Sequence, residues 1–267
     1  EVLINVDSVS TRRADLDVIE PVLGPRGYAV LSHNLGETRA YNGLARLARG
    51  RYVLFAQDDM ILAGRSGAMR EAVRLFQSLG SAPRALGLLG FAEGACCLQC
   101  DPGAFLHEVR RPRCREPVTG SKVEAVVSAG MGPLMVERDF FLQLGGFNET
   151  LSERGEPSTL LDFELSARVW RAGRSVMIAA PFTQTAGAHS HIAWTFPGLE
   201  AKDASRCRRV RSAFLDAVSA SHPSPAVQQT NGRLDCSGAG TDDQFCGLPT
   251  ECGSKFCQGG CSRRVPP

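Results

Sequence analysis

Two adjacent carboxylates, Asp58 and Asp59, follow directly after the apolar run 52–56 (YVLFA). Neighbouring negative charges repel each other, and a divalent cation would remove this conflict. Mg²⁺ and Mn²⁺ prefer hard oxygen ligands and commonly bridge a few carboxylates and a substrate diphosphate. Taken alone, the pair fits a solvated acidic turn or a helix cap better than a metal site, so the surrounding sequence must decide between the two.

A third carboxylate, Asp162, stands at the start of the stretch 160–172, where the spacing of apolar residues predicts a helix that ends at Gly173. The dipole of that helix would favour the ionised form of Asp162. A positioned carboxylate can act as a general base and take the proton of an attacking hydroxyl, which is typically worth about 10²–10⁴-fold in rate. The alternative is a carboxylate that only stabilises the helix end, by ~0.3–1 kcal/mol.

These carboxylates need a scaffold, and the chain alternates apolar runs with helical periodicity. This alternation predicts an α/β fold with a mostly parallel sheet flanked by helices. Ligands bind such sheets beyond the carboxyl ends of the strands, and both Asp7 and the Asp58–Asp59 pair lie at such ends. The predicted strands are 1–8, 28–31, 52–56, 85–91, 123–129 and 175–179, and the predicted helices are 12–23, 37–49, 66–79, 137–144 and 160–172.

The remaining segments divide the chain into a large domain and a small tail. We assign residues 1–218 to the α/β domain, with 92–122 as an inserted loop and 202–218 as an amphipathic helix that has a basic, solvated face. Residues 219–233 have the composition of a linker. Residues 234–267 form a Cys-rich tail.

Composition excludes several classes of protein. Of the 267 residues, 43% are hydrophobic, which is enough for a sizeable core. The net charge is only +2, so no strong positive electrostatic field favours nucleic acid as a partner. No apolar stretch approaches the ~20 residues of a membrane span. The chain opens with Glu1 inside an apolar run, which we interpret as an excerpt or a processed chain, compatible with an upstream signal or anchor. Phosphate-loop, dinucleotide-binding and nucleophile-elbow motifs are absent.

Ten cysteines predict disulfides and therefore an oxidising compartment. Four lie within 96–114 and five in the tail, with Cys207 between the two groups. The odd number in the tail requires a partner elsewhere, for which Cys207 is one candidate, or a continuation of the chain. The rival interpretation is a zinc site with ligands of suitable spacing, namely Cys97, Cys100, His107 and Cys114.

Three segments resemble, in the expected order, the motifs of family 2 glycosyltransferases. Residues 3–10 (LINVDSVS) look like a strand that ends in V-D-D-G-S. Residues 34–59 look like N-x-G-x-x-x-A-x-N-x-G, then A-R-G-x-Y, then a strand and an acidic pair, although glycine follows one rather than two positions after Asn42. Residues 145–151 (GGFNETL) and 160–173 (LLDFELSARVWRAG) look like G-G-F-D-E followed by E-D-x-D-L-x-x-R-x-x-x-A-G.

The resemblance covers about residues 1–195 and implies a GT-A fold. It implies an inverting enzyme that uses Mn²⁺ or Mg²⁺ to move a sugar from a nucleotide-diphosphate donor, UDP-linked in our prediction, to a hydroxyl of a glycan, protein or lipid that the sequence leaves open. The implied site residues are Asp7 at the nucleotide base, Asp58 at the ribose or donor sugar and Arg39 at the donor, Asp59 as metal ligand with His189 or His191 near the diphosphate, and Asp162 as catalytic base.

Two other functions stay open. A degenerate domain could bind carbohydrate or act as a scaffold, because Leu161 replaces the usual Glu and the first strand of the family is not seen before residue 1. A nucleotidyltransferase with a related sheet is less favoured, because no basic Gly-rich loop lies near the start. The tail segment 245–262 faintly resembles the end of a hevein-type chitin-binding module. We predict a secretory-pathway protein, in the Golgi lumen or outside the cell, that binds no nucleic acid.

Overall fold

The computed structural model describes residues 1–7, 13–57, 60–64, 67–80, 84–91, 94–95, 108–109, 112–155, 161–180, 182–185 and 224–237. Some of the residues singled out in the sequence lie outside these ranges, so their roles stay predictions. They are the acidic pair Asp58–Asp59, both His189 and His191, three of the zinc candidates (Cys97, Cys100 and His107), Cys207, the segment 202–218 and the tail beyond residue 237.

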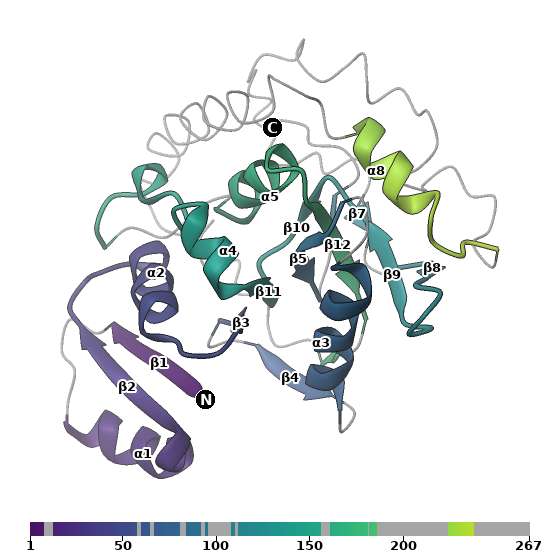
Figure 1. The fold of residues 1–267 in the computed structure, drawn as a ribbon. Helices are drawn as coiled ribbons and strands as arrows, with labels where there is room; N and C mark the ends of the chain where they lie inside the picture. Colours follow the sequence, from purple (N-terminus) through teal and green to yellow (C-terminus); the bar gives the residue numbers. More distant parts are fainter. Residues whose placement is uncertain are drawn as a thin grey trace, which may run out of the picture.

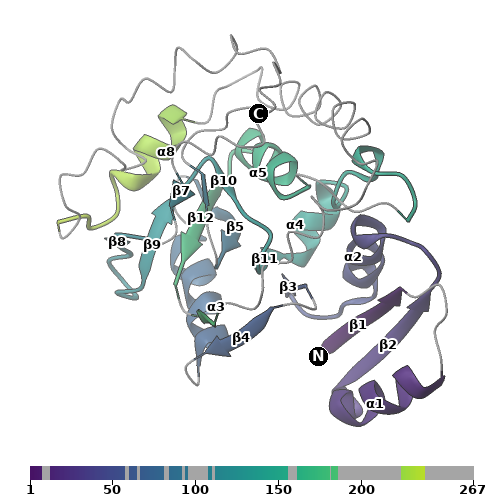
Figure 2. The same cartoon turned by 180° about the vertical axis from the view of Figure 1, so that it is seen from behind.

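The first two strands form a parallel pair. β1 (Val2–Asp7) lies beside β2 (Gly27–Ser32), with Val2 opposite Gly27 and Asp7 opposite Ser32. Parallel strands require a crossover connection, which α1 (Arg13–Leu23) and the 3₁₀ turn Gly24–Arg26 provide. Figures 1 and 2 both show β1, β2 and α1 grouped at one end of the molecule.

The main sheet, within the described residues, has the strand order β3–β11–β5–β12–β9–β8. β5 and β12 are parallel, β11 is antiparallel to β3 and β5, and β9 is antiparallel to β12 and β8. The principal strands β3, β5 and β12 therefore point the same way. The bounds are β3 (Tyr52–Phe55), β5 (Leu86–Gly90), β8 (Cys114–Arg115), β9 (Lys122–Ala125), β11 (Leu134–Glu137) and β12 (Ser175–Ala179).

The predicted fold class, an α/β fold with a central sheet flanked by helices, is confirmed. The sheet is mixed rather than mostly parallel, because β9 and β11 run through it in the opposite direction. Two smaller sheets accompany it in the described part of the chain. They pair β10 (Ser128–Ala129) with β6 (Gly94–Ala95) and β6 with β7 (Glu108–Val109), and β4 (Ile61–Gly64) with β13 (Phe182–Thr185).

The predicted strand 123–129 is in fact two strands, β9 and β10. Between them the carbonyl oxygens of Val126 and Val127 accept hydrogen bonds from the indole N–H of Trp170, at 3.1 and 3.0 Å. The N–H of Val126 still donates to the carbonyl oxygen of Val176 in β12 at 3.0 Å, but the two oxygens bond to a side chain, and β9 ends at Ala125. β10 then pairs with β6, which lies in the segment 92–122 that was expected to be a loop.

The helices that pack on the sheet are α2 (Glu37–Leu47), α3 (Ala68–Leu79), α4 (Arg138–Gln143) and α5 (Leu161–Arg171). In Figure 1 the central strands lie between α5 above and α3 below. An aromatic cluster, with ring centroids 5.0 to 5.8 Å apart, joins α2, β3 and α4. Its members are Tyr41, Phe55, Phe141 and Phe147, and it fixes α2 against the edge of the sheet.

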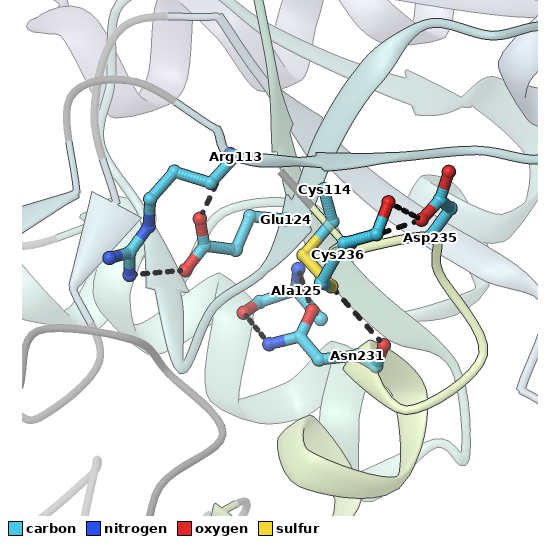
Figure 3. Close-up of a disulfide and its surroundings, with 8 residues drawn as sticks. Arg113, Cys114, Glu124, Ala125, Asn231, Asp235 and Cys236 are labelled. Carbon is cyan, nitrogen blue, oxygen red and sulfur yellow. Dashed lines mark hydrogen bonds and ion pairs between the residues drawn. A yellow bond between two sulfur atoms is a disulfide. The ribbon is translucent and has the colours of Figure 1, made fainter. Parts of the chain in front are cut away.

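A further helix, α8 (Ser224–Asn231), lies within the segment 219–233 that was expected to be a linker. Val227 is only 2% exposed, because the helix packs on β9 and β12. The side-chain amide of Asn231 accepts from the N–H of Ala125 at 2.7 Å and donates to the C=O of Ala125 at 3.1 Å (Figure 3). Residues 224–231 are thus a packed part of the domain and differ from a linker.

The prediction of disulfides is confirmed for one pair. Cys236, just after α8, is bonded to Cys114 of β8, and their Cα atoms are 4.2 Å apart (Figure 3). This tail cysteine therefore pairs with a member of the first group and not with Cys207. Cys114 is consequently not free to act as the fourth ligand of the zinc site that was considered, and that ligand set is wrong. None of the helices in the described ranges has the length and apolar character that a membrane crossing requires.

Candidate functional site

Asp162 lies in the first turn of α5, and its side chain is held from two sides. Oδ2 accepts a hydrogen bond from the N–H of Met131 at 2.7 Å, and Oδ1 accepts one from the N–H of Phe163 at 3.0 Å. The residue is only 7% exposed. The loop that carries Met131 connects β10 to β11, so Asp162 joins the helix to the point where the chain enters the antiparallel strand.

Burial dominates the electrostatics of Asp162 and raises its pKa to about 6. Removing a carboxylate from water disfavours its charged form. The hydrogen bonds from Phe163 and Met131 oppose this effect, and the negative charge of Glu37 adds to it. The carboxyl group is therefore ionised near neutral pH and is a stronger base than an ordinary aspartate.

A second hydrogen-bond chain fixes the backbone around Asp162. The hydroxyl of Ser166 donates to the carbonyl oxygen of Asp162 at 2.7 Å and accepts from the N–H of Ala129 at 3.2 Å. The first turn of α5 is thereby tied to β10. A side chain held through its own helix and a neighbouring strand keeps its geometry, which a general base would require.

Glu37 is a site residue that the sequence did not predict. It opens α2, and its charge acts on Asp162. Its Oε1 accepts a hydrogen bond from Nε2 of Gln57 at 2.8 Å. Gln57 immediately precedes the Asp58–Asp59 pair. The start of α2 therefore contacts the chain between β3 and the acidic pair, and its carboxylate also acts electrostatically on the start of α5.

Asp7 lies at the carboxyl end of β1, as predicted, and its carboxylate holds the loop that leads into α2. Oδ1 accepts from the N–H of Leu35 at 2.8 Å and from the hydroxyl of Ser32 at 2.9 Å, and Oδ2 accepts from the N–H of Gly36 at 2.7 Å. Partial burial raises the pKa of Asp7, but these hydrogen bonds outweigh it, so the pKa lies below its ordinary value. Asp7 is thus connected to the site through the two residues before Glu37.

Arg39, which was expected to bind the donor, points its guanidinium at the turn after α4. It donates to the carbonyl oxygens of Ser152 at 3.0 Å and Glu149 at 3.1 Å, and it lies 3.7 Å from the Glu149 carboxylate. Arg39 therefore holds this turn against α2 in the structure. Direct contact with a donor stays a prediction.

The same turn explains why two of the sequence motifs occur together. Asn42 of the second motif accepts from the N–H of Phe147 at 2.8 Å and donates to its C=O at 2.9 Å. Gly146 has a φ of +76°, and a Cβ there would lie 2.4 Å from Oδ1 of Asn42. Arg168 of the third motif donates to the carbonyl oxygens of Leu144 and Gly146. These motif residues build the frame of the site rather than its reactive surface.

The donor chemistry of this place suits a hard divalent cation. The side chains that meet there, or that follow directly in sequence, offer carboxylate and amide oxygens, which are the ligands that Mn²⁺ and Mg²⁺ prefer. The described ranges themselves contain no group of three or more His, Cys, Asp or Glu arranged to hold a metal ion. The predicted ligands Asp59, His189 and His191, and the donor residue Asp58, lie outside those ranges.

Fold and site together define an α/β protein with a buried carboxylate at the edge of its sheet. No family model matches the chain, and no curated protein matches its sequence. Similar solved structures include GalNAc-T7 with UDP, GalNAc and Mn²⁺ (16% identity, TM-score 0.45, 67% of this chain and 36% of that one). They also include the mannosyltransferase PcManGT from Pyrobaculum calidifontis with GDP-Man and Mn²⁺ (18% identity, TM-score 0.46, 87% of this chain and 70% of that one). The chain thus spans about a third of the length of the first.

Proposed function

We propose that this chain is a metal-dependent glycosyltransferase that moves a sugar from a nucleotide-diphosphate donor to an acceptor hydroxyl. One observation carries the proposal. The carboxylate of Asp162 is buried and feels the negative charge of Glu37, and Glu37 in turn accepts a hydrogen bond from Gln57, the residue that precedes the acidic pair. A fixed base next to an oxygen-rich segment is the arrangement that sugar transfer from a diphosphate needs.

In the proposed reaction, the acceptor oxygen attacks the anomeric carbon of the donor sugar while the bond from that carbon to the diphosphate breaks. The proton of the acceptor hydroxyl goes to the carboxylate of Asp162, and a nucleoside diphosphate leaves. Transfer by one in-line displacement inverts the configuration of the sugar. A bound Mn²⁺ or Mg²⁺ would neutralise charge on the leaving diphosphate.

The donor site in this proposal uses residues from the ends of β1 and β3. Asp7 contacts the base of a nucleotide, which is UDP-linked in the proposal, Asp58 contacts the ribose or the sugar, and Asp59 ligates the metal with His189 or His191 near the diphosphate. Support comes from the contacts of Asp7 and Gln57, which place both strand ends against α2. Arg39 serves the donor indirectly, because its guanidinium holds the 149–152 turn.

The replacement Asp59→Ala tests the metal role. We expect the wild type to release nucleoside diphosphate from one member of a panel of UDP- and GDP-sugars in the presence of Mn²⁺. The rate of the variant should be at least 100-fold lower, because the charge of the leaving diphosphate is no longer neutralised. The readout is the nucleoside diphosphate formed per minute.

A matched control for Asp59→Ala is Asp139→Ala, because Asp139 is an exposed aspartate in the first turn of α4 that pairs with Arg138. Asp139→Ala should keep the wild-type rate. Equal activity of wild type and Asp59→Ala would remove the metal role. Release of pyrophosphate instead of nucleoside diphosphate would indicate a nucleotidyltransferase.

The alternative of a non-enzymatic scaffold has one observation in its favour. Leu161, which stands where the resemblance places an acidic residue, is 4% exposed and belongs to the core. Calorimetry with UDP and Mn²⁺ separates the two functions, since an enzyme binds both and a scaffold binds neither. We further propose the secretory pathway as the location, and the Cys114–Cys236 disulfide supports an oxidising compartment.

A further inference from the structure

α2 holds both residues that precede the acidic pair. Nε2 of Gln57 donates to Oε1 of Glu37 at 2.8 Å, and the hydroxyl of Tyr41 donates to the carbonyl oxygen of Ala56 at 3.1 Å. Glu37 and Tyr41 are four positions apart, so they lie one helical turn apart on the same face of α2. One face of α2 therefore holds in place the two residues that follow β3.

The residues on either side of the acidic pair are also bonded to each other. The N–H of Met60 donates to the carbonyl oxygen of Gln57 at 3.3 Å, and the N–H of Gln57 donates to the sulfur of Met60 at 3.4 Å. Both ends of the segment that carries the pair thus depend on the position of Gln57. The side chain of Gln57 is in turn held by Glu37.

α2 is a rigid support for this contact. The loop before the helix is held by the Asp7 carboxylate, Tyr41 lies in the aromatic cluster, and Asn42 is hydrogen bonded to the backbone of Phe147. Glu37 also lies close enough to Asp162 for its charge to act there. One side chain of this helix, Glu37, therefore bonds the residue before the acidic pair and also acts electrostatically on Asp162.

We propose that Glu37 is a positioning residue, which sets the place of the Asp58–Asp59 segment relative to Asp162 and so determines the affinity for the divalent cation. The inference rests on the proposed function. Partners that orient metal ligands commonly contribute 10- to 100-fold to metal affinity. The contact to Gln57 is charge-assisted, which makes it stronger than a hydrogen bond between neutral groups.

The test is a Mn²⁺ titration of the intact chain, in which electron paramagnetic resonance measures the free ion. We expect Glu37→Ala and Gln57→Ala each to raise the dissociation constant about tenfold. The double variant should bind no more weakly than either single variant, because both remove the same hydrogen bond. Glu37→Gln keeps an acceptor oxygen for Gln57 and should stay within about threefold of the wild type.

Glu71→Ala is the matched control. Glu71 is also half-buried in the first turn of a helix and also accepts from a neutral side chain, the hydroxyl of Ser121 at 2.7 Å, but it lines a separate cleft between α3 and residues 118–121. Both alanine variants lose a carboxylate near a helix N-terminus, so a purely structural role predicts equal shifts in melting temperature and unchanged Mn²⁺ affinity. We expect Glu71→Ala to bind Mn²⁺ as the wild type does.

Two results would overturn this inference and leave the proposed function standing. One is wild-type Mn²⁺ affinity in Glu37→Ala while Asp59→Ala has lost binding. The other is equal weakening in Glu37→Gln and Glu37→Ala, which would assign the effect to charge rather than to position. If the wild type binds no Mn²⁺, or if Asp59→Ala binds as tightly as the wild type, the proposed function and this inference fall together.

Discussion

The environment of Asp162 acts on its charge in two opposing directions. Burial disfavours the carboxylate, while the N–H groups of Met131 and Phe163 favour it, and burial prevails with a pKa of about 6. A pKa near the working pH is favourable for a general base, since the group is ionised often enough and still binds a proton well. The same balance makes this residue a source of pH dependence in both activity and stability.

For activity, we predict that the transfer rate of the wild type rises with pH through about 6, because only the ionised carboxylate of Asp162 can accept the acceptor proton. Asp162→Asn should keep UDP and Mn²⁺ binding within about threefold and lose at least 100-fold in transfer. Rate profiles between pH 5 and 9 and calorimetry check this. Unchanged turnover in Asp162→Asn would remove the residue as the base.

For stability, the sign follows from a folded pKa that lies above the unfolded value. The contribution of Asp162 to the free energy of unfolding is fully present below its ordinary pKa of 3.8 and is lost as the pH rises through about 6. For a pKa shift of this size the loss is about 3 kcal/mol. Asp162→Asn lacks this titration. The free energy of unfolding of this variant, measured in urea, should therefore increase relative to that of the wild type between pH 4 and 8. A difference between the two proteins that does not change with pH would contradict the assignment.

At the scale of elements, the site depends on how α2 is locked to the turn after α4. Asn42 is 2% exposed and satisfies both the N–H and the C=O of Phe147, and its amide also donates to Glu149 at 2.9 Å. Gly146 allows this close approach because it has no Cβ. α2 carries Glu37 and follows the loop held by Asp7, so displacement of α2 would disturb the site as a whole.

We predict that Asn42→Ala lowers the free energy of unfolding by about 2–4 kcal/mol, because it leaves buried backbone groups of Phe147 without partners. Urea unfolding at pH 7 measures this. Asn148→Ala is the control, since within the described residues the side chain of Asn148 bonds only to Thr150, and it should cost about 1 kcal/mol or less. Equal losses in the two variants would contradict the role given to Asn42.

At the scale of the whole molecule, the C-terminal part of the described chain is bound to the edge of the main sheet. The amide of Asn231 pairs with the backbone of Ala125, and Asp235 exchanges backbone hydrogen bonds with Arg115. The disulfide between Cys114 and Cys236 joins residues 122 positions apart. Such a link removes much of the freedom of the unfolded chain, so it stabilises the folded domain.

We predict that Cys236→Ser lowers the free energy of unfolding by about 2–4 kcal/mol under oxidising conditions, because the long loop is no longer closed in the unfolded state. Urea unfolding without reductant measures the difference. Ser237→Ala serves as the control, because this exposed side chain bonds only to Asp235 in the described residues, and it should stay within about 0.5 kcal/mol of the wild type. Wild-type stability in Cys236→Ser would contradict the prediction.

Much of the fold could be predicted from the sequence where a pattern is local. The apolar runs that became β1, β3, β5 and β12, and the helical spacing that became α2, α3 and α5, reflect which residues of one element face the core. β11 was missed, because the Gly and Pro residues in 130–133 mask a short strand that is specified by its neighbours β3 and β5. α8 was missed because its polar composition matches a linker until Val227 and Asn231 meet β9.

The sequence by itself determined the α/β class and placed Asp7 at a strand end and Asp162 at a helix start, because periodicity and helix-end signals depend only on neighbouring residues. The tertiary structure alone decided that Glu37 bonds Gln57 and acts on the charge of Asp162, that Arg39 holds a turn, and that Cys114 pairs with Cys236. These relations join residues 20 to 125 positions apart in the chain. They depend on which elements pack together, and no local pattern carries that information.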